Sequence, residues 1–416
     1  MIKFIDIFAG TGGVRLAFEQ ACKELNIRSK CVFSSEIDKK AAASYELNFN
    51  ENPLSDITAV NTIPEFDFLL AGFPCQAFSY AGKQKGFEDE TRGTLFFDIL
   101  RILKKNKPKY LLLENVRGLT THDKGNTFRV IKESLASLGY NINFALLNSS
   151  EFGVPQNRVR IYIVGVLGGD ANLTLKSNLG AADTNKYISK AGALTVQDIL
   201  ETEVDKKYHC TERFQQQLKN VVGDDLSKLD GYRLSDYRGG KTIHSWDLGI
   251  KGECSQNEKD FLNLLIANRR KKIFGTHQDG KSLTREQIQT FYTKSDFELV
   301  SNSLIEKGYL KLIDDKYKPV CGNMSFEVFK FLDPNGISIT LTASDSNRLG
   351  VVHNNIARRL TPRECARLQG YPDTYKLIDN DNAVYKQMGN GVSVPVIKEV
   401  LLDFFRNSSV ANLKCS

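Results

Sequence analysis

The sequence predicts an α/β protein with a mainly parallel sheet and a second, smaller domain. Over residues 1–169, short apolar runs alternate with amphipathic segments, which is typical of parallel strands covered by helices on both faces. The alternation stops at residue 170, where the chain becomes richer in Lys, Asn, Asp and Ser. Motifs that carry chemistry return from residue 336 to 416, so we expect this last part to fold back onto the first domain.

The expected strands of the first domain are apolar and rich in β-branched residues. They are residues 3–8, 30–36, 66–73, 109–116, 142–149 and 160–166. The intervening segments have apolar residues at steps of three and four, which predicts helices. They are residues 14–25, 39–49, 94–106 and 127–139. Ligands of such sheets collect at the carboxyl ends of the strands, where the motifs below fall.

The composition excludes several classes. The 416 residues contain no apolar run of about eighteen residues, so we expect no transmembrane helix. The first ten residues are typical of a strand rather than of a signal peptide. We therefore expect a cytoplasmic protein without a membrane anchor. The eight cysteines form no CxxC pair, so neither a disulfide framework nor a zinc site is expected. The net charge of +7 favours a polyanionic partner only weakly, because both signs are mixed along the chain.

Residues 170–335 are the expected second domain. Within it, residues 256–320 read as three helices and a hairpin around Asp314 and Asp315. This order suggests a winged-helix-like unit that reads nucleic acid. An ordinary helical insertion with a solvated face explains the pattern equally well, and the sequence leaves both open.

A glycine-rich turn follows the first strand and opens a helix. Gly10, Gly12 and Gly13 let the backbone approach a ligand closely, and Glu36 after the next strand is positioned to bind ribose hydroxyls. The turn departs from the full dinucleotide pattern, so a smaller nucleoside cofactor fits better. Asp56 and Ile57 are expected to contact its adenine. A tight turn without a ligand is the alternative.

Cys75 follows Pro74 at the end of another strand, and three polar residues stand at neighbouring strand ends. A free thiol in isolation is more often a small core residue. Glu114, however, ends a nearby strand and can protonate a ring nitrogen if burial raises its pKa. Arg158 and Arg160 lie two apart on an extended stretch, so both can point to one side and bind an oxygen, although an exposed edge strand would look the same.

Six motifs in this order together resemble those of the DNA (cytosine-5) methyltransferases. They are DIFAGTGG, GFPCQAFS, ENVRGL, VPQNRVRIYIVG, RRLTPRECARLQGYPD and QMGNGVSVPV. The resemblance covers residues 1–168 and 336–400, and the loop after Cys75 particularly resembles that of compact bacterial modification enzymes.

The resemblance implies a Rossmann-like methyltransferase sheet, S-adenosyl-L-methionine as cofactor and double-stranded DNA as substrate. It implies that Cys75 attacks C6 of a flipped cytosine, that Glu114 contacts N3, and that Arg158 and Arg160 orient the base. The implied cofactor contacts are Phe8, Gly10, Thr11, Gly12, Gly13, Glu36, Ile37, Asp56, Ile57, Pro74, Asn390 and Gly391. Ile37 and Gly391 depart from the residues most frequent in the family. Residues 170–335 would form the target-recognition domain.

The long loop after Cys75 is expected to close over the flipped base. Its glycines supply hinges, and Lys83, Lys85 and Arg92 can grip DNA phosphates. A plain surface loop is the alternative.

We expect a monomer that protects host DNA beside a restriction endonuclease that acts on the same site without direct contact. A tRNA cytosine-5 methyltransferase is the nearest rival, but a reader of about 165 residues favours base edges in a DNA groove. A non-catalytic repressor is the rival from another class, and the intact Cys75 and Glu114 argue against it.

Overall fold

The computed structural model describes residues 1–74, 95–177, 194–237, 241–276, 281–320 and 326–408. The chain forms two compact units. The first contains residues Met1–Glu201, Asn335–Ser346 and Pro362–Ser416, and the second contains Thr202–Pro334 and Asn347–Thr361.

The first unit is built on a six-stranded sheet with the strand order β2-β1-β3-β4-β6-β5. The strands are β1 (Ile2–Ile7), β2 (Ser29–Ser35), β3 (Phe68–Gly72), β4 (Tyr110–Val116), β5 (Tyr140–Asn148) and β6 (Val159–Leu167). The first four are parallel, and β6 runs antiparallel to both β4 and β5. All six expected strands are therefore confirmed.

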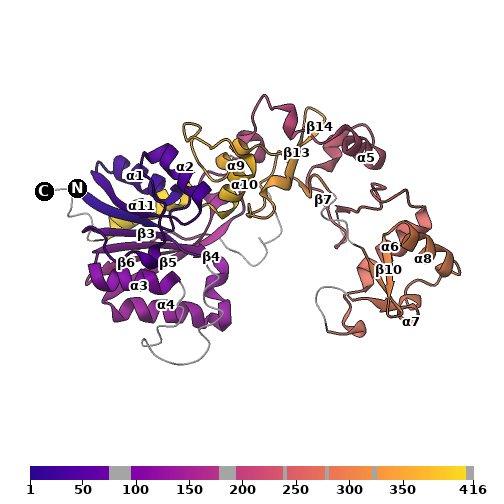
Figure 1. Ribbon diagram of the computed structural model, residues 1–416, viewed down its shortest axis with the longest axis horizontal. Helices are drawn as coiled ribbons and strands as arrows, with labels where there is room; N and C mark the ends of the chain where they lie inside the picture. Colours follow the sequence, from indigo (N-terminus) through magenta and orange to yellow (C-terminus); the bar gives the residue numbers. More distant parts are fainter. Residues whose placement is uncertain (75–94, 178–193, 238–240, 277–280, 321–325, 409–416) are drawn as a thin grey trace. The chain divides into compact units, whose positions relative to one another are not determined.

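Helices cover both faces of this sheet (Figure 1). The helices of this unit are α1 (Gly13–Glu24), α2 (Lys39–Phe49), α3 (Leu95–Asn106), α4 (Asn126–Ser137), α9 (Pro362–Leu368), α10 (Asp381–Asn390) and α11 (Val394–Asn407), of which α9 and α10 lie beyond the sheet. On one face the rings of Phe18 from α1 and Phe405 from α11 meet at 5.9 Å. On the other face, α3 and α4 share a core with Ile5, Leu69 and Leu111.

The second unit contains two small sheets. The first has the order β14-β13-β12-β7-β8 and the second the order β10-β11-β9. The strands are β7 (Arg233–Leu234), β8 (Thr242–Ile243), β9 (Leu283–Thr284), β10 (Leu310–Ile313), β11 (Lys316–Pro319), β12 (Lys330–Phe331), β13 (Leu349–His353) and β14 (Ile356–Arg359). The helices are α5 (Glu212–Val222), α6 (Gln256–Asn268), α7 (Arg285–Gln289) and α8 (Phe297–Glu306).

The segment predicted as three helices and a hairpin has those elements. Helices α6, α7 and α8 share one hydrophobic cluster with the hairpin β10–β11. The hairpin turns at Asp314 and Asp315, which both adopt positive φ. The short strand β9 pairs with β11, so the full order is helix, strand, helix, helix, strand, strand.

The division into units differs from the expected boundaries in two places. The first unit runs on to Glu201 instead of ending at residue 169, because Val196 donates its N–H to the carbonyl of Gly336 and Ile199 accepts from Arg367. Residues 347–361 belong to the second unit instead of the C-terminal return, because β13 pairs with β12. In both places the paired segments are far apart in the sequence, which is why sequence patterns did not predict these boundaries. Among the residues described, no helix is both long and apolar enough to cross a bilayer.

Candidate active site

A cavity of about 1080 Å³ opens at the carboxyl ends of the parallel strands. The loops that follow β1, β2, β3 and β4 line it from one side, and α10 with the loop after it lines it from the other. The chain leaves β1 for β2 and later returns to the opposite side of β1 as β3. Sheets of this type bind ligands at such a reversal of strand order.

The glycine turn after β1 packs too closely against its neighbours for other residues. Gly12 has a φ of +81°, and a Cβ there would lie 2.3 Å from the Phe49 ring. A Cβ on Gly13 would lie 2.4 Å from the Tyr371 hydroxyl. The backbone of the turn is therefore open to the cavity at Gly10 and Gly13, while α2 and the C-terminal segment pack against the turn.

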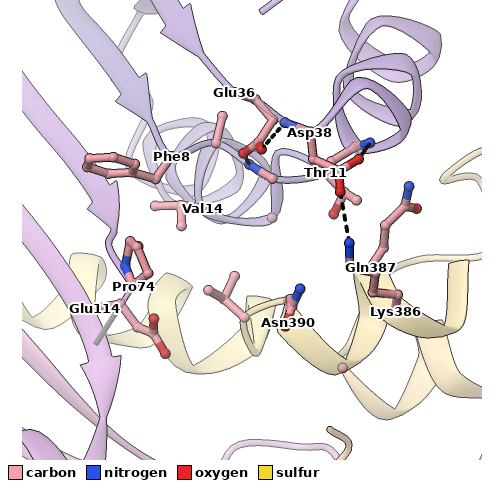
Figure 2. Close-up of a pocket in the computed structure, with 18 of the residues that line it drawn as sticks. Phe8, Thr11, Val14, Glu36, Asp38, Pro74, Glu114, Lys386, Gln387 and Asn390 are labelled. Carbon is pink, nitrogen blue, oxygen red and sulfur yellow. Dashed lines mark hydrogen bonds and ion pairs between the residues drawn. The ribbon is translucent and has the colours of Figure 1, made fainter. Parts of the chain in front are cut away.

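Glu36 fixes this turn to the end of β2. One carboxylate oxygen accepts the N–H of Gly10 at 2.7 Å, and the other accepts the N–H of Asp38 at 2.8 Å (Figure 2). Each oxygen keeps a further lone pair for a ligand hydroxyl. Glu36 thus both shapes the turn and lines the cavity.

Helix α10 closes the far wall. Gln387 donates from Nε2 to the carbonyl of Lys40 at 3.0 Å and accepts from the Ser44 hydroxyl at 3.0 Å. Lys386 forms an ion pair with Asp38 at 3.1 Å. These contacts hold α10 against α2, the helix that follows β2 (Figure 2).

Glu114 is a buried carboxyl group of the cavity. It lies near the end of β4, opposite Gly72 of β3, and only 8% of its surface is exposed. Burial raises its pKa, while the Arg160 and Arg158 guanidinium groups oppose that rise. The Arg160 Nε lies 3.4 Å from the Glu114 Oε1. The carboxyl is therefore biased towards its protonated form, with a cation beside it.

Arg158 is used differently from its neighbour. It is 2% exposed and donates to the carbonyl oxygens of Leu341 and Gly391. Burial, with repulsion from Arg160, lowers its pKa to about 10. Arg158 therefore fastens two C-terminal segments to the start of β6, a contact that the sequence pattern did not reveal.

Most of the predicted site residues that the structure describes line the cavity. They are Phe8, Gly10, Thr11, Gly13, Glu36, Ile37, Pro74, Glu114, Arg158, Arg160, Asn390 and Gly391. Gly12, Asp56 and Ile57 do not line it: Gly12 packs on α2, Asp56 caps the turn at Thr58, and Ile57 lies in the core. The predicted nucleophile Cys75 and the predicted DNA contacts Lys83, Lys85 and Arg92 fall outside the described residues.

Sequence reasoning missed several residues of the C-terminal wall. Tyr371, Lys386, Gln387 and Val392 line the cavity, and Tyr371 shares a hydrogen bond of 2.9 Å with Thr11. Gln387 could have been predicted from the sequence, because it precedes Asn390 and Gly391 by one helical turn and so lies on the same face of α10. No comparable spacing identifies Tyr371.

The sequence matches the family described as C-5 cytosine-specific DNA methylase over residues 2–406. The chain belongs to this family. It is a DNA (cytosine-5) methyltransferase with the α/β sheet that the resemblance implied.

Bacterial relatives of this methyltransferase match along almost all of its length. The sequence is 60% identical to the Type II methyltransferase M.BanI of Aneurinibacillus aneurinilyticus, over 98% of this chain and 96% of that one. It is 56% identical to M.HgiCI of Herpetosiphon aurantiacus, over 99% of this chain and all of that one.

Solved structures share the fold of the methyltransferase. A putative DNA modification methyltransferase from an E. coli prophage is similar with a TM-score of 0.52 and 20% identity, over 98% of this chain and 99% of that one. The S. pombe Dnmt2 methyltransferase has a TM-score of 0.52 and 18% identity, with the same coverage.

Proposed function

We propose that this enzyme transfers a methyl group from S-adenosyl-L-methionine to C5 of a cytosine that is flipped out of duplex DNA. The observation that carries this proposal is Glu114. It is a buried carboxyl with a raised pKa, it lies one strand away from the β3 end that leads to Cys75, and it lines the same cavity as the glycine turn.

The residues of the cavity fit the proposed cofactor. The turn leaves backbone open at Gly10, which has a φ of +54°, and at Gly13, where a Cβ would collide with Tyr371, and Glu36 offers acceptors for ribose hydroxyls. Asn390 and Gly391 would close the cofactor site from the C-terminal side. When bound, the cofactor supplies an electrophilic methyl group.

Cys75 is proposed as the nucleophile. Its thiolate would add to C6 of cytosine, which makes C5 electron-rich, and the thiolate would leave again once the C5 proton is lost. Glu114 would hold a proton at N3 and so offset the negative charge that develops on the ring. Arg160 would keep the Glu114 carboxyl in place and contact the base. Arg158, whose two terminal nitrogens already donate to carbonyls, would position the C-terminal wall.

The covalent step is tested with a Cys75→Ser variant and a duplex that contains 5-fluorocytosine. We expect the variant to lose methyl transfer while it still binds DNA, and the wild-type enzyme to form a covalent complex that survives denaturation, because the fluorine at C5 cannot leave as a proton. Full activity of the variant, or no trapped complex, would contradict the mechanism. Incorporation of labelled methyl groups into tRNA but not into DNA would contradict the substrate.

We further propose that the second unit selects the target sequence and that the enzyme acts in the bacterial cytoplasm, on nucleoid DNA, as a monomer. The names of the Type II relatives support a role in a restriction-modification system, in which an endonuclease cuts the same site when it is unmethylated. The loop with Lys83, Lys85 and Arg92 remains a proposed grip on phosphates. Sequencing of methylated cytosines in DNA from an expressing host would identify the site.

A further inference from the structure

A buried hydroxyl stands next to Glu114 in the sheet. Tyr162 of β6 is directly opposite Glu114 of β4 in an antiparallel pair, so the two side chains leave the sheet on the same face. Tyr162 is fully buried, and its hydroxyl has no hydrogen-bond partner among the described residues. Buried polar groups are nearly always paired, so an unpaired one beside a reactive carboxyl indicates a group that is paired in another state.

A second unpaired atom lies close by. Arg158 donates from its two terminal nitrogens to the carbonyls of Leu341 and Gly391, but its buried Nε has no partner in the part of the chain that the structure describes. Burial, and then the negative charge of Glu114, raises the pKa of Tyr162, so this hydroxyl keeps its proton and can donate it. Both unpaired atoms can therefore donate a hydrogen bond, and each requires an acceptor.

Ionised Glu114 is such an acceptor. A protonated carboxyl uses one oxygen as a donor, whereas a carboxylate accepts at both oxygens and forms stronger hydrogen bonds. In the proposed reaction the proton of Glu114 moves to N3 as the ring takes up negative charge, and it returns when the thiolate leaves. A donor that becomes paired only when the carboxylate forms stabilises that state selectively.

We propose that Tyr162 is a positioning residue for methyl transfer, whose hydroxyl donates to the Glu114 carboxylate while N3 of the base holds the proton. The hydrogen bond forms directly or through one buried water molecule, as is common for such groups. Among the described residues, the other charged or titratable side chains around this pair are Arg158, Arg160 and Tyr371, the last of which interacts with Arg158. This inference rests on the proposed function.

The test compares full-length Tyr162→Phe with the wild type, because phenylalanine keeps the ring and removes only the hydroxyl. The substrate is a long DNA fragment made by amplification, which carries no methyl groups. We expect the maximal single-turnover rate to fall roughly ten- to a hundredfold, as for the loss of a hydrogen bond to a charged group. The half-saturating concentrations of DNA and S-adenosyl-L-methionine should stay unchanged.

The pH dependence distinguishes this role from a structural one. A donor to the ionised form lowers the pKa of Glu114, so removal of the donor raises that pKa. The decline of the rate at higher pH should therefore move upward by about one pH unit in Tyr162→Phe. The variant should resist urea at least as well as the wild type, because the hydroxyl has no described partner to lose.

Tyr140→Phe is the matched control. It removes the same atom from another buried tyrosine of this sheet, whose hydroxyl donates to the carbonyl of Pro108 at 2.6 Å. We expect the opposite pattern, because this carbonyl loses its donor: a lower urea midpoint with an unchanged rate and pH dependence.

Three results would overturn the proposal. They are a wild-type rate and pH dependence in Tyr162→Phe, a lower rate whose decline with pH is not shifted, and an equal shift in Tyr140→Phe. In each of these cases methyl transfer by the wild type leaves the proposed function intact. If the wild type transfers no methyl group to DNA, the proposed function fails, and this inference fails with it.

Discussion

Two arginines separated by one residue perform different tasks in this cavity. Arg160 lies beside the Glu114 carboxyl, whereas Arg158 donates to two carbonyls of the C-terminal segments. Alternation along an extended stretch predicts that both point to the same side, and they do, since each lines the cavity. The difference comes from what each guanidinium meets there.

The first prediction concerns Glu114. Because its native pKa is raised, folding favours the neutral form: the stabilisation is complete below the unfolded pKa of about 4.3 and is lost as pH rises through the native pKa. Glu114→Gln should therefore remove this decline of stability with pH. It should also lower the turnover number roughly 100-fold or more and abolish the part of the activity decline at higher pH that is due to Glu114.

Chemical unfolding and single-turnover methylation from pH 4 to pH 9 would test both parts. An Arg129→Gln variant, which breaks an exposed ion pair with Glu133 on α4, serves as the control for a general effect of charge. Wild-type pH dependence in Glu114→Gln would contradict the role of its proton.

The second prediction separates the arginines. Arg158→Met leaves two carbonyl oxygens without their charged donor, so we expect it to lower the free energy of unfolding by about 3 kcal/mol and to weaken cofactor binding. Arg160→Met should cost less stability and lower the turnover number more. Calorimetric cofactor titration and urea unfolding distinguish the two, and identical profiles would contradict the division of tasks.

Among the elements, the glycine turn and α10 together line one part of the cavity. The turn follows the first strand, whereas α10 is formed by residues Asp381–Asn390, far along the chain. Tyr371 and Val392 lie where a side chain at position 13 would be. The turn must therefore lack a side chain for the C-terminal wall to approach.

The third prediction is that Gly13→Ala pushes this wall away. A Cβ at 2.4 Å from the Tyr371 hydroxyl must displace it and disturb its bond with Thr11, so we expect cofactor affinity to fall at least tenfold and stability by about 1–3 kcal/mol. Gly118→Ala is the control, because an added Cβ there meets no atom closer than 4.0 Å. Equal cofactor affinity in both variants would rule out the effect.

Sequence patterns predicted the elements and most of the cavity because strand ends and glycine turns leave local signals. Three features escaped for a shared reason. Arg158 donates to the carbonyls of residues 341 and 391, which are distant in the sequence. Strand β13 pairs with β12, although other residues separate them in the chain. Asp56 accepts the backbone N–H of Thr58, two residues further along. Each of these contacts depends on which of several available hydrogen-bond partners a residue binds in the folded chain. The periodicity of the sequence does not predict that partner.

The helix α8 shows the same limit. The order of elements matches a winged helix, which suggests that α8 enters a DNA groove. Its exposed positions are Glu298, Leu299, Asn302 and Glu306, which include two carboxylates and no cation. The arrangement of elements alone therefore does not identify the surface that binds DNA.

At the scale of the whole molecule, all the described residues that line the cavity belong to the first unit. Ligands of one unit should therefore stabilise that unit selectively, because binding stabilises only the structure that forms the site.

The fourth prediction follows from this division. Scanning calorimetry should resolve two transitions, and S-adenosyl-L-methionine at about 100 times its dissociation constant should add roughly 2.7 kcal/mol to the first unit alone. For a unit of this size the corresponding midpoint should rise by roughly 5–10 °C. A single transition, or equal shifts of both, would contradict independent units. Buffer with S-adenosyl-L-methionine's parent amino acid, methionine, is the control.

The contact of α1 with α11 also has a consequence for folding during synthesis, because the two helices lie far apart in the sequence. Phe18 of α1 packs against Phe405 of α11, which is synthesised much later, and the Gly13 turn packs against Tyr371 and Val392. A nascent chain that has completed its sheet and its second unit still lacks the C-terminal wall of the cavity. Translation that stops between residues 361 and 371 would therefore yield a chain whose cavity is incomplete.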